Sequence, residues 1–157
     1  MASSSDKNSF DASVGHKYFS ADYFNRVWGL LDKKDRTPEE DALMLSMCHA
    51  SFAHWNDRDD VTDRELSIGL WQLSRVYAVL GKSIPAKDQA ERCVEVSANL
   101  EDPFCIGYSY EALARAEKLA RNEDAATAAL TKARECAEKV ESEEDKKYLL
   151  SDLEDLG

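Results

Sequence analysis

An internal repeat of 40 residues is the sequence feature that most constrains the fold. Shifting the chain by 40 positions aligns four identical pairs: Leu73 with Leu113, Arg75 with Arg115, Ala86 with Ala126 and Glu95 with Glu135. Small residues recur where two antiparallel helices must approach closely. A fixed period with small residues at equivalent positions is typical of stacked helical hairpins.

Capping signals divide the chain into seven predicted helices. Thr37 with Glu40, and Thr62 with Glu65, have the spacing of capping boxes. The 6 glycines and 3 prolines are few for 157 residues, and no window alternates strictly enough to predict a strand. The approximate helical ranges are 20–34, 37–55, 62–80, 85–97, 102–120, 124–140 and 142–156.

These elements predict an all-α superhelix of about three antiparallel helical hairpins. The amphipathic segment 142–156 is expected to cap the last hairpin, whose apolar face an open stack leaves exposed. Hydrophobic residues make up 43% of the chain and charged residues 32%, an ordinary globular composition that argues against disorder. We expect one domain over residues 18–157, preceded by a mobile tail, residues 1–17, that docks through Phe10.

The first repeat resembles a tetratricopeptide repeat. The residues that carry the resemblance are Leu70, Leu73, Ser74, Tyr77, Gly81, Ala86, Ala90 and Cys93. The second repeat matches more loosely, because Glu117 stands in place of the tyrosine and Arg121 in place of the glycine. Residues 18–56 match by position alone, with Trp28 where the pattern has a small residue. The chain is also similar to a group of uncharacterised bacterial helical-repeat proteins.

The resemblance implies a concave surface lined by the first helix of each hairpin. On the two repeats this surface includes Ile68 and Val79, and the predicted partner-binding residues are Trp71, Arg75, Tyr108, Glu111, Arg115 and Lys118. Aromatic and arginine side chains of this kind are enriched at binding hot spots. Three cations on one face of an acidic chain favour an acidic segment or a C-terminal carboxylate as ligand. The competing interpretation makes Trp71 a core residue and pairs Arg75 with Glu111 or another acid.

The charge balance argues against two classes of function. The net charge of −11 repels phosphate backbones and anionic lipid surfaces, so we expect neither nucleic acid nor membrane as a partner. The longest apolar run, residues 76–80, is far too short to span a bilayer. The first residues lack the apolar stretch of a signal peptide, so we expect a soluble, cytoplasmic protein.

Little in the sequence points to catalysis, a metal or a cofactor. The four cysteines have no CxxC spacing and are expected to be reduced and mostly buried. His49 and His54 are five residues apart, which on a helix turns them about 140° from one another and disfavours a shared metal ion. The expected state of His49 is a hydrogen-bonded core residue, and that of His54 a residue near a helix end.

The predicted function is a non-catalytic module that binds a protein or peptide on its concave face. One alternative is a small-molecule-binding or hydrolytic protein with a site near His49, His54 and Trp55, although an enzyme is the less favoured class. Another is a self-associating structural protein, a homodimer formed through residues 20–34 or 142–156. If the concave face binds the partner, replacing Arg75 and Arg115 together by alanine is expected to abolish capture with little change in stability.

Overall fold

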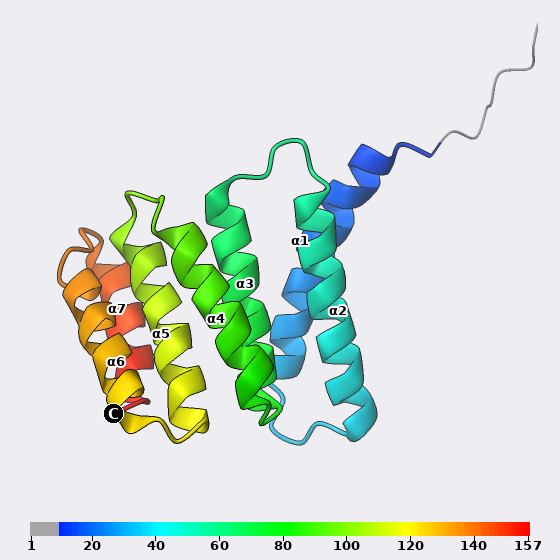
Figure 1. The fold of residues 1–157 in the computed structure, drawn as a ribbon. Helices are drawn as coiled ribbons and strands as arrows, with labels where there is room; N and C mark the ends of the chain where they lie inside the picture. The colour runs from blue at the N-terminus through cyan, green and yellow to red at the C-terminus, as the bar shows by residue number, and fades with distance from the viewer. Residues whose placement is uncertain (1–9) are drawn as a thin grey trace, which may run out of the picture.

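Seven helices make up the part of the chain that the computed structural model describes, residues 10–157 (Figure 1). Their bounds are α1 (Ala12–Leu31), α2 (Pro38–Asn56), α3 (Asp63–Val79), α4 (Ser83–Ser97), α5 (Pro103–Leu119), α6 (Glu123–Ala137) and α7 (Glu143–Glu154). Within this range no strand occurs. The all-α prediction is confirmed.

The 40-residue period is reproduced in the helix bounds. Each bound of α5 and α6 lies 40 residues after the matching bound of α3 and α4. Ala86 and Ala126, equivalent in the two repeats, are 0% and 2% exposed, as helix–helix contact positions require. The predicted capping boxes of α2 and α3, at Thr37 and Thr62, are both present.

The N-terminal boundary differs from the prediction. Helix α1 begins at Ala12, and Asp11 caps it by accepting a hydrogen bond of 3.0 Å from the backbone N–H of Ser13. Residues 12–17 are therefore helical rather than part of a tail, because the capping aspartate lies nine residues before the start that the apolar pattern suggested. The Phe10 ring lies over Gly15, so close that a Cβ atom added to Gly15 would be 2.6 Å from the ring. Phe10 itself is nevertheless 76% exposed. Residues 1–9 of the predicted tail lie outside the described residues.

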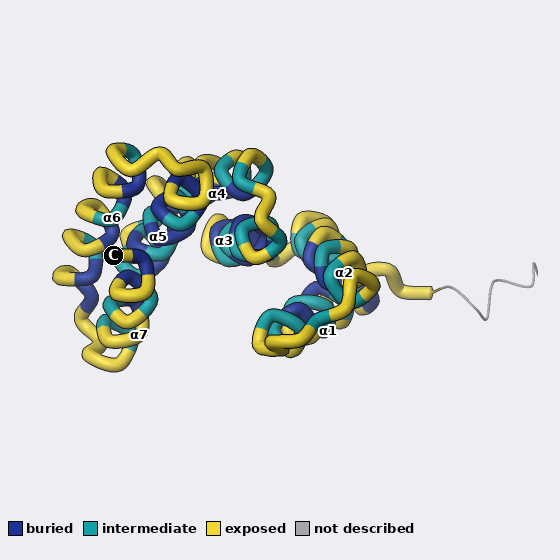
Figure 2. The backbone as a smooth tube through the Cα atoms, turned by 90° about the horizontal axis from the view of Figure 1, so that it is seen from below, coloured by how far each residue is buried: buried dark blue, intermediate teal, exposed yellow. Residues whose placement is uncertain are grey.

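The helices form an arch of antiparallel pairs, α1 with α2, α3 with α4 and α5 with α6 (Figure 2). Seen along the helices, α2, α4 and α6 form the outer side, and α3 lies inside with α1 and α7 to either side of it. Buried alanines join neighbouring pairs: Ala86 and Ala90 of α4 pack with Ala112 and Ala116 of α5. Because alanine adds little bulk, the helix axes can lie close together there.

Helix α7 packs against both helices of the last pair, as a capping helix would. Leu149 and Leu153 are 0% and 1% exposed and pack with Ala133 and Ala137 of α6. Gly107 allows this approach, since a Cβ atom there would lie 2.6 Å from Cδ2 of Leu149. The result is that α7 covers the inner side of α5 and becomes one wall of the concave face.

The two repeats end their first helices in the same way, although one uses glycine and the other arginine. Gly81 has φ +72° and Arg121 has φ +61°, both in the left-handed region. In each case the residue that follows donates its N–H to a carbonyl five residues back, Lys82 to Tyr77 and Asn122 to Glu117, both at 2.9 Å. The turn that the tetratricopeptide pattern assigns to glycine is thus formed in both repeats.

Exchanging these two residues tests the strain at position 121. The left-handed conformation costs a non-glycine residue roughly 1–2 kcal/mol, while glycine pays some entropy on folding. Arg121→Gly is therefore expected to raise the free energy of unfolding by about 0.5–1 kcal/mol, measured in urea. Gly81→Arg, at a position with open space around it, should lower it by a similar amount. A destabilising Arg121→Gly would mean that the arginine makes a contact that outweighs the strain.

None of the helices among residues 10–157 combines the length and apolar character needed to cross a membrane.

Candidate functional site

A cavity of about 320 Å³ opens on the inner side of the arch, and four helices contribute to it. We call it the groove. Its apolar lining consists of Trp28 from α1, Ile68 and Trp71 from α3, Phe104 and Tyr108 from α5, and Tyr148 from α7. Its polar lining consists of Arg64, Ser67, Cys105 and Asp152. Cavities that hold small ligands or anchoring side chains commonly combine such an apolar wall with a few polar groups.

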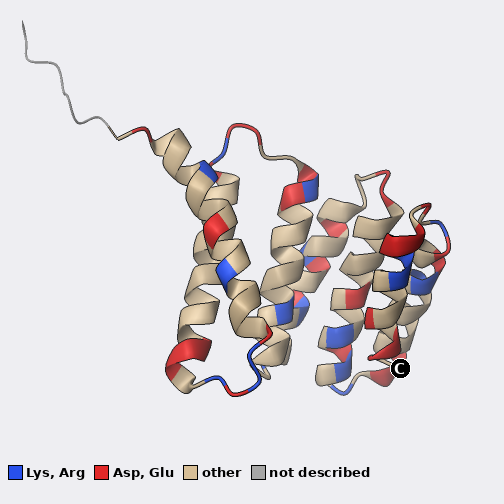
Figure 3. Cartoon of the chain, turned by 180° about the vertical axis from the view of Figure 1, so that it is seen from behind, with Lys and Arg blue, Asp and Glu red and all other residues tan. Residues whose placement is uncertain are grey.

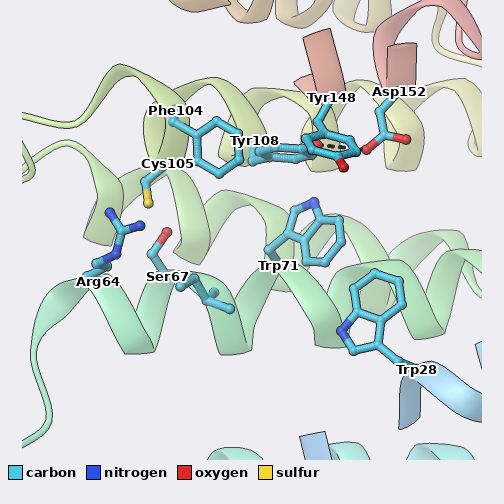
Figure 4. A pocket seen from close by; sticks show the side chains of 10 residues that line it. Trp28, Arg64, Ser67, Trp71, Phe104, Cys105, Tyr108, Tyr148 and Asp152 are labelled. Atoms are coloured by element: carbon cyan, nitrogen blue, oxygen red, sulfur yellow. Dashed lines mark hydrogen bonds between the residues drawn. The ribbon is translucent and has the colours of Figure 1, made fainter. Parts of the chain in front are cut away.

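Four of the rings form a continuous aromatic wall from α1 to α5 (Figure 4). The ring centroids of Trp28 and Trp71 are 5.5 Å apart, those of Trp71 and Tyr108 also 5.5 Å, and those of Tyr108 and Phe104 4.9 Å. Tyr148 stands on α7 and remains 60% exposed. A ligand can therefore contact rigid aromatic surface without first displacing a buried side chain.

Most polar groups of the groove already have partners within the protein. The Tyr108 hydroxyl donates a hydrogen bond of 2.9 Å to Oδ2 of Asp152. Burial, and then this carboxylate, raise the pKa of Tyr108 well above its usual range, so the phenol stays protonated and remains a donor. Arg64 forms an ion pair with Asp102, the N-cap residue of α5.

A buried ion cluster lies next to the aromatic wall. Glu111 is 0% exposed, and its Oε2 accepts a hydrogen bond of 2.8 Å from the indole N–H of Trp71. Its Oε1 accepts two bonds from Arg115, at 2.9 and 2.5 Å, and one from Arg75 at 3.4 Å. Trp71 and Glu111 are repeat-equivalent, as are Arg75 and Arg115, so the two repeats meet in this cluster. The pairing of Arg75 with Glu111, which the competing interpretation predicted, is present.

This cluster overturns one expectation from the sequence. Replacing Arg75 and Arg115 by alanine was expected to leave the stability nearly unchanged, on the premise of partly exposed ion pairs. Glu111 is instead completely buried, so the double substitution would leave a carboxylate without its cations in the interior, which is strongly unfavourable. Burial, and then the neighbouring Arg115, lower the pKa of Arg75.

The structure brings together only part of the predicted partner-binding set. Trp71 and Tyr108 line the groove, whereas Glu111, Arg75 and Arg115 form the adjoining cluster. Lys118 lies near the C-terminal end of α5, where its ammonium group donates to the carbonyl of Leu156. The predicted set and the groove therefore share α3 and α5, but the predicted set extends further toward the C-terminal ends of these helices.

Several groove residues were missed by sequence reasoning, for two different reasons. Three of them lie one or two helical turns before a predicted residue: Arg64 and Ser67 before Trp71, and Phe104 before Tyr108. Extending the predicted face of each helix toward its N-terminus, to positions i−4 and i−7, would have found them. Trp28 was noticed as a misfit to the repeat, but not as a groove residue. Tyr148 and Asp152 carried no signal, because nothing in the sequence shows that α7 folds along the inner side of α5.

The histidines do not form a common site. His49 is exposed, not a core residue as expected, and its Nε2 lies 2.7 Å from the Tyr77 hydroxyl. Nδ1 of His54 faces Nδ1 of His16 on α1 at 2.9 Å, and Trp55 packs beneath the guanidinium of Arg58, 4.0 Å from the ring centroid. The two predicted histidines thus contact different helices, and neither lines the groove. Among residues 10–157 no cluster of three or more His, Cys, Asp or Glu side chains is arranged to hold a metal ion.

The four cysteines are free, and burial makes three of them poor nucleophiles. Desolvation raises the pKa of Cys48 to about 12 and that of Cys93 to about 11. Cys105 lines the groove, and desolvation together with the neighbouring Asp102 raises its pKa to about 12. Cys136 is only half-buried.

At pH 8 we therefore expect Cys136 to react first with a thiol reagent, and Cys48 and Cys93 to react only on the time scale of unfolding. Mass spectrometry of peptides from partly labelled native protein would measure the order. Rapid native labelling of Cys48 or Cys93 would contradict the packing of α2 and α4.

No protein-family model, curated protein or solved structure matches this chain. The groove is therefore the feature of the molecule from which a function can be inferred.

Proposed function

We propose that this protein is a non-catalytic binding module that holds a segment of a partner protein or peptide in the groove. The observation that carries the proposal is the open aromatic wall, formed by side chains from three helices and faced by Tyr148 on a fourth. Trp28, Trp71 and Tyr108 are partly buried and Tyr148 is exposed. Tryptophan and tyrosine are among the residues most enriched at binding hot spots. The same proposal assigns the helical pairs to the tetratricopeptide type, supported by the buried small residues Ala86 and Ala126 and by the two matching turns. The period of 40 residues departs from the 34 of that repeat.

The size of the groove suits an anchoring side chain. Its volume of about 320 Å³ lies at the small end of the range of roughly 300–1,000 Å³ for ligand cavities. One or two apolar side chains of a partner segment would fill it, while the rest of the segment lies along α3 and α5. A free small molecule of similar size is the corresponding alternative, and competition by short peptides separates the two.

An acidic segment or a C-terminal carboxylate is the alternative partner, which the arginines beside the groove would favour. Arg75 and Arg115 are 25% and 20% exposed, and their donors that do not reach Glu111 are available to a second carboxylate. Such a ligand would have to bind in addition to Glu111, because expelling Glu111 would leave buried cations unpaired. The free thiols fit a reducing compartment, so we propose the cytoplasm as the place of action.

Peptide selection on two matched tyrosine variants tests the proposal. Tyr148 lines the groove at 60% exposure, whereas Tyr18 lies on α1 outside the groove at 62% exposure. We expect random 12-residue peptides displayed on phage to be enriched on the native protein. Tyr148→Ala should weaken the selected peptides by about tenfold, the effect of losing one aromatic hot-spot residue. Tyr18→Ala should leave their affinity unchanged.

Two results would contradict the proposal. One is enrichment of peptides that bind Tyr148→Ala as tightly as the native protein, which would put the binding surface elsewhere. The other is a failure to enrich any peptide while the folded protein remains monomeric and stable.

A second candidate function, self-association, is favoured by exposed apolar residues on the first turns of α1 and just before it. Val14 and Tyr18 are one turn apart on α1 and are 61% and 62% exposed, and Phe10, which precedes the helix, is 76% exposed. Exposed large apolar side chains that lie near one another are typical of an interaction surface. If it forms a homodimer, the elution volume should depend on protein concentration and lose that dependence in Val14→Lys.

A further inference from the structure

We infer that the segment bound in the groove is basic, and that Asp152 receives one of its cationic side chains against the aromatic wall. This inference rests on the proposed function, because it specifies the chemistry of the partner at the same site. It reverses the sign of the ligand that the sequence favoured. The reasons lie in which charges of the groove are already paired.

Asp152 is the one acid that lines the groove, and no cation of residues 10–157 forms a direct ion pair with it, although Arg75 of the adjoining cluster interacts with it at longer range. Its Oδ2 accepts the bond from Tyr108, which leaves the other carboxylate oxygen open to a ligand. Arg64, the one base in the lining, is already paired with Asp102. Among the lining residues, the charge without a partner is therefore negative.

The arginines that suggested an anionic ligand are held by a side chain of the protein itself. Arg75 and Arg115 both bind the fully buried Glu111, and neither lines the groove. Three-quarters or more of each side chain is buried. They act on a ligand only from outside the aromatic wall.

The aromatic wall itself favours a cation. Lysine and arginine side chains bind over the faces of tryptophan and tyrosine through the ring quadrupole, and more strongly where water is excluded. Arginine also offers an apolar stem and a planar fork of donors that matches a carboxylate. Trp71, Tyr108 and Asp152 lie close together in the groove (Figure 4), so one arginine side chain can contact ring and carboxylate together.

The surroundings of the groove add attraction at longer range. From Glu143 to Asp155, along α7 and its C-cap residue, the sequence holds six acids and two lysines (Figure 3). Tyr148 and Asp152 of this helix line the groove. The chain as a whole has a net charge of −11. A basic segment is therefore steered toward this face, and its association should slow as salt is added.

Three pools of 12-residue peptides test the inference. The pools carry arginine, leucine or glutamate at a fixed central position and random residues elsewhere, and their binding is compared on the native protein, on Asp152→Asn and on Glu154→Gln. Asparagine keeps an acceptor for the Tyr108 hydroxyl, so the wall is retained. Glu154 is exposed on the same helix and outside the groove, so its variant removes one charge of α7 without touching the site.

We expect the arginine pool to bind the native protein best. Asp152→Asn should weaken it by about tenfold, as for the loss of a charge-assisted hydrogen bond, with no change for the leucine pool. Glu154→Gln should leave both pools unchanged. If the leucine or glutamate pool binds best in a Tyr148-dependent manner, or if Asp152→Asn has no effect on such binding, the inference is overturned while the proposed function stands. If no pool shows Tyr148-dependent binding, the proposed function fails and the inference fails with it.

Discussion

Replacing Glu111 by alanine is expected to lower the free energy of unfolding by about 3 kcal/mol. Removing one partner from a buried ion pair costs about 3–5 kcal/mol. The lower end applies because Arg75 and Arg115 keep 25% and 20% of their side chains exposed. The two guanidinium groups, freed of the carboxylate that they share, would also repel one another. Urea unfolding followed by circular dichroism measures the change.

The partner substitutions supply the control for this prediction. The double variant Arg75→Met, Arg115→Met should be less stable than the native protein, since Glu111 is then buried without a cation. Adding Glu111→Leu to this pair should recover most of the lost stability, because a buried ion cluster replaced as a whole by apolar residues is often neutral. A single Glu111→Ala variant that loses less than about 1 kcal/mol, the contribution of an exposed pair, would contradict the burial of this carboxylate.

Leu149→Ala is expected to cost about 3 kcal/mol and to loosen α7. Leu149 is 0% exposed, packs with Ala133 and Ala137 of α6, and reaches the space above Gly107. Buried leucine-to-alanine substitutions cost about 2–5 kcal/mol, more where the neighbours cannot close the cavity. The glycine and alanine neighbours cannot fill the space, so only the larger side chains around the cluster, such as Leu130 and Leu150, could move toward it. Hydrogen exchange should therefore show faster exchange of the α7 amides than of those in α3.

Tyr148→Ala is the matched control on the same helix. Tyr148 precedes Leu149 in the sequence but is 60% exposed, so its loss should change stability by no more than about 0.5 kcal/mol. Equal destabilisation by the two substitutions would mean that α7 packs in another rotation, and that Tyr148 does not face the groove.

The architecture was predictable because its signals are local and repeated. The shift of 40 residues, the capping boxes at Thr37 and Thr62 and the glycine at position 81 each depend on a few neighbouring residues. The start of α1 was placed too late, because its first turns are largely exposed and carry no apolar stripe on a core face. Asp11 was the available signal, and it was not used.

The groove was only partly predictable because it depends on contacts between distant helices. Trp71 and Tyr108 follow from the periodicity of their own helices. Trp28, Tyr148 and Asp152 reach the groove only because α1 and α7 flank α3 and α5 in space. The pairing of Arg75 with Glu111 was foreseen by the competing interpretation, but the complete burial of Glu111 was not, since burial depends on how α3 and α5 pack together.

The three tryptophan indoles allow the most direct test of binding in the groove. Trp28 and Trp71 line it, while Trp55, which follows His54 in the sequence, packs under Arg58 outside the groove. In a ¹H–¹⁵N spectrum of the protein titrated with a peptide selected on it, the indole signals of Trp28 and Trp71 should shift and saturate together. The Trp55 signal should stay in place. A titration that moves Trp55 and leaves Trp28 and Trp71 unchanged would contradict binding in the groove and favour the alternative site.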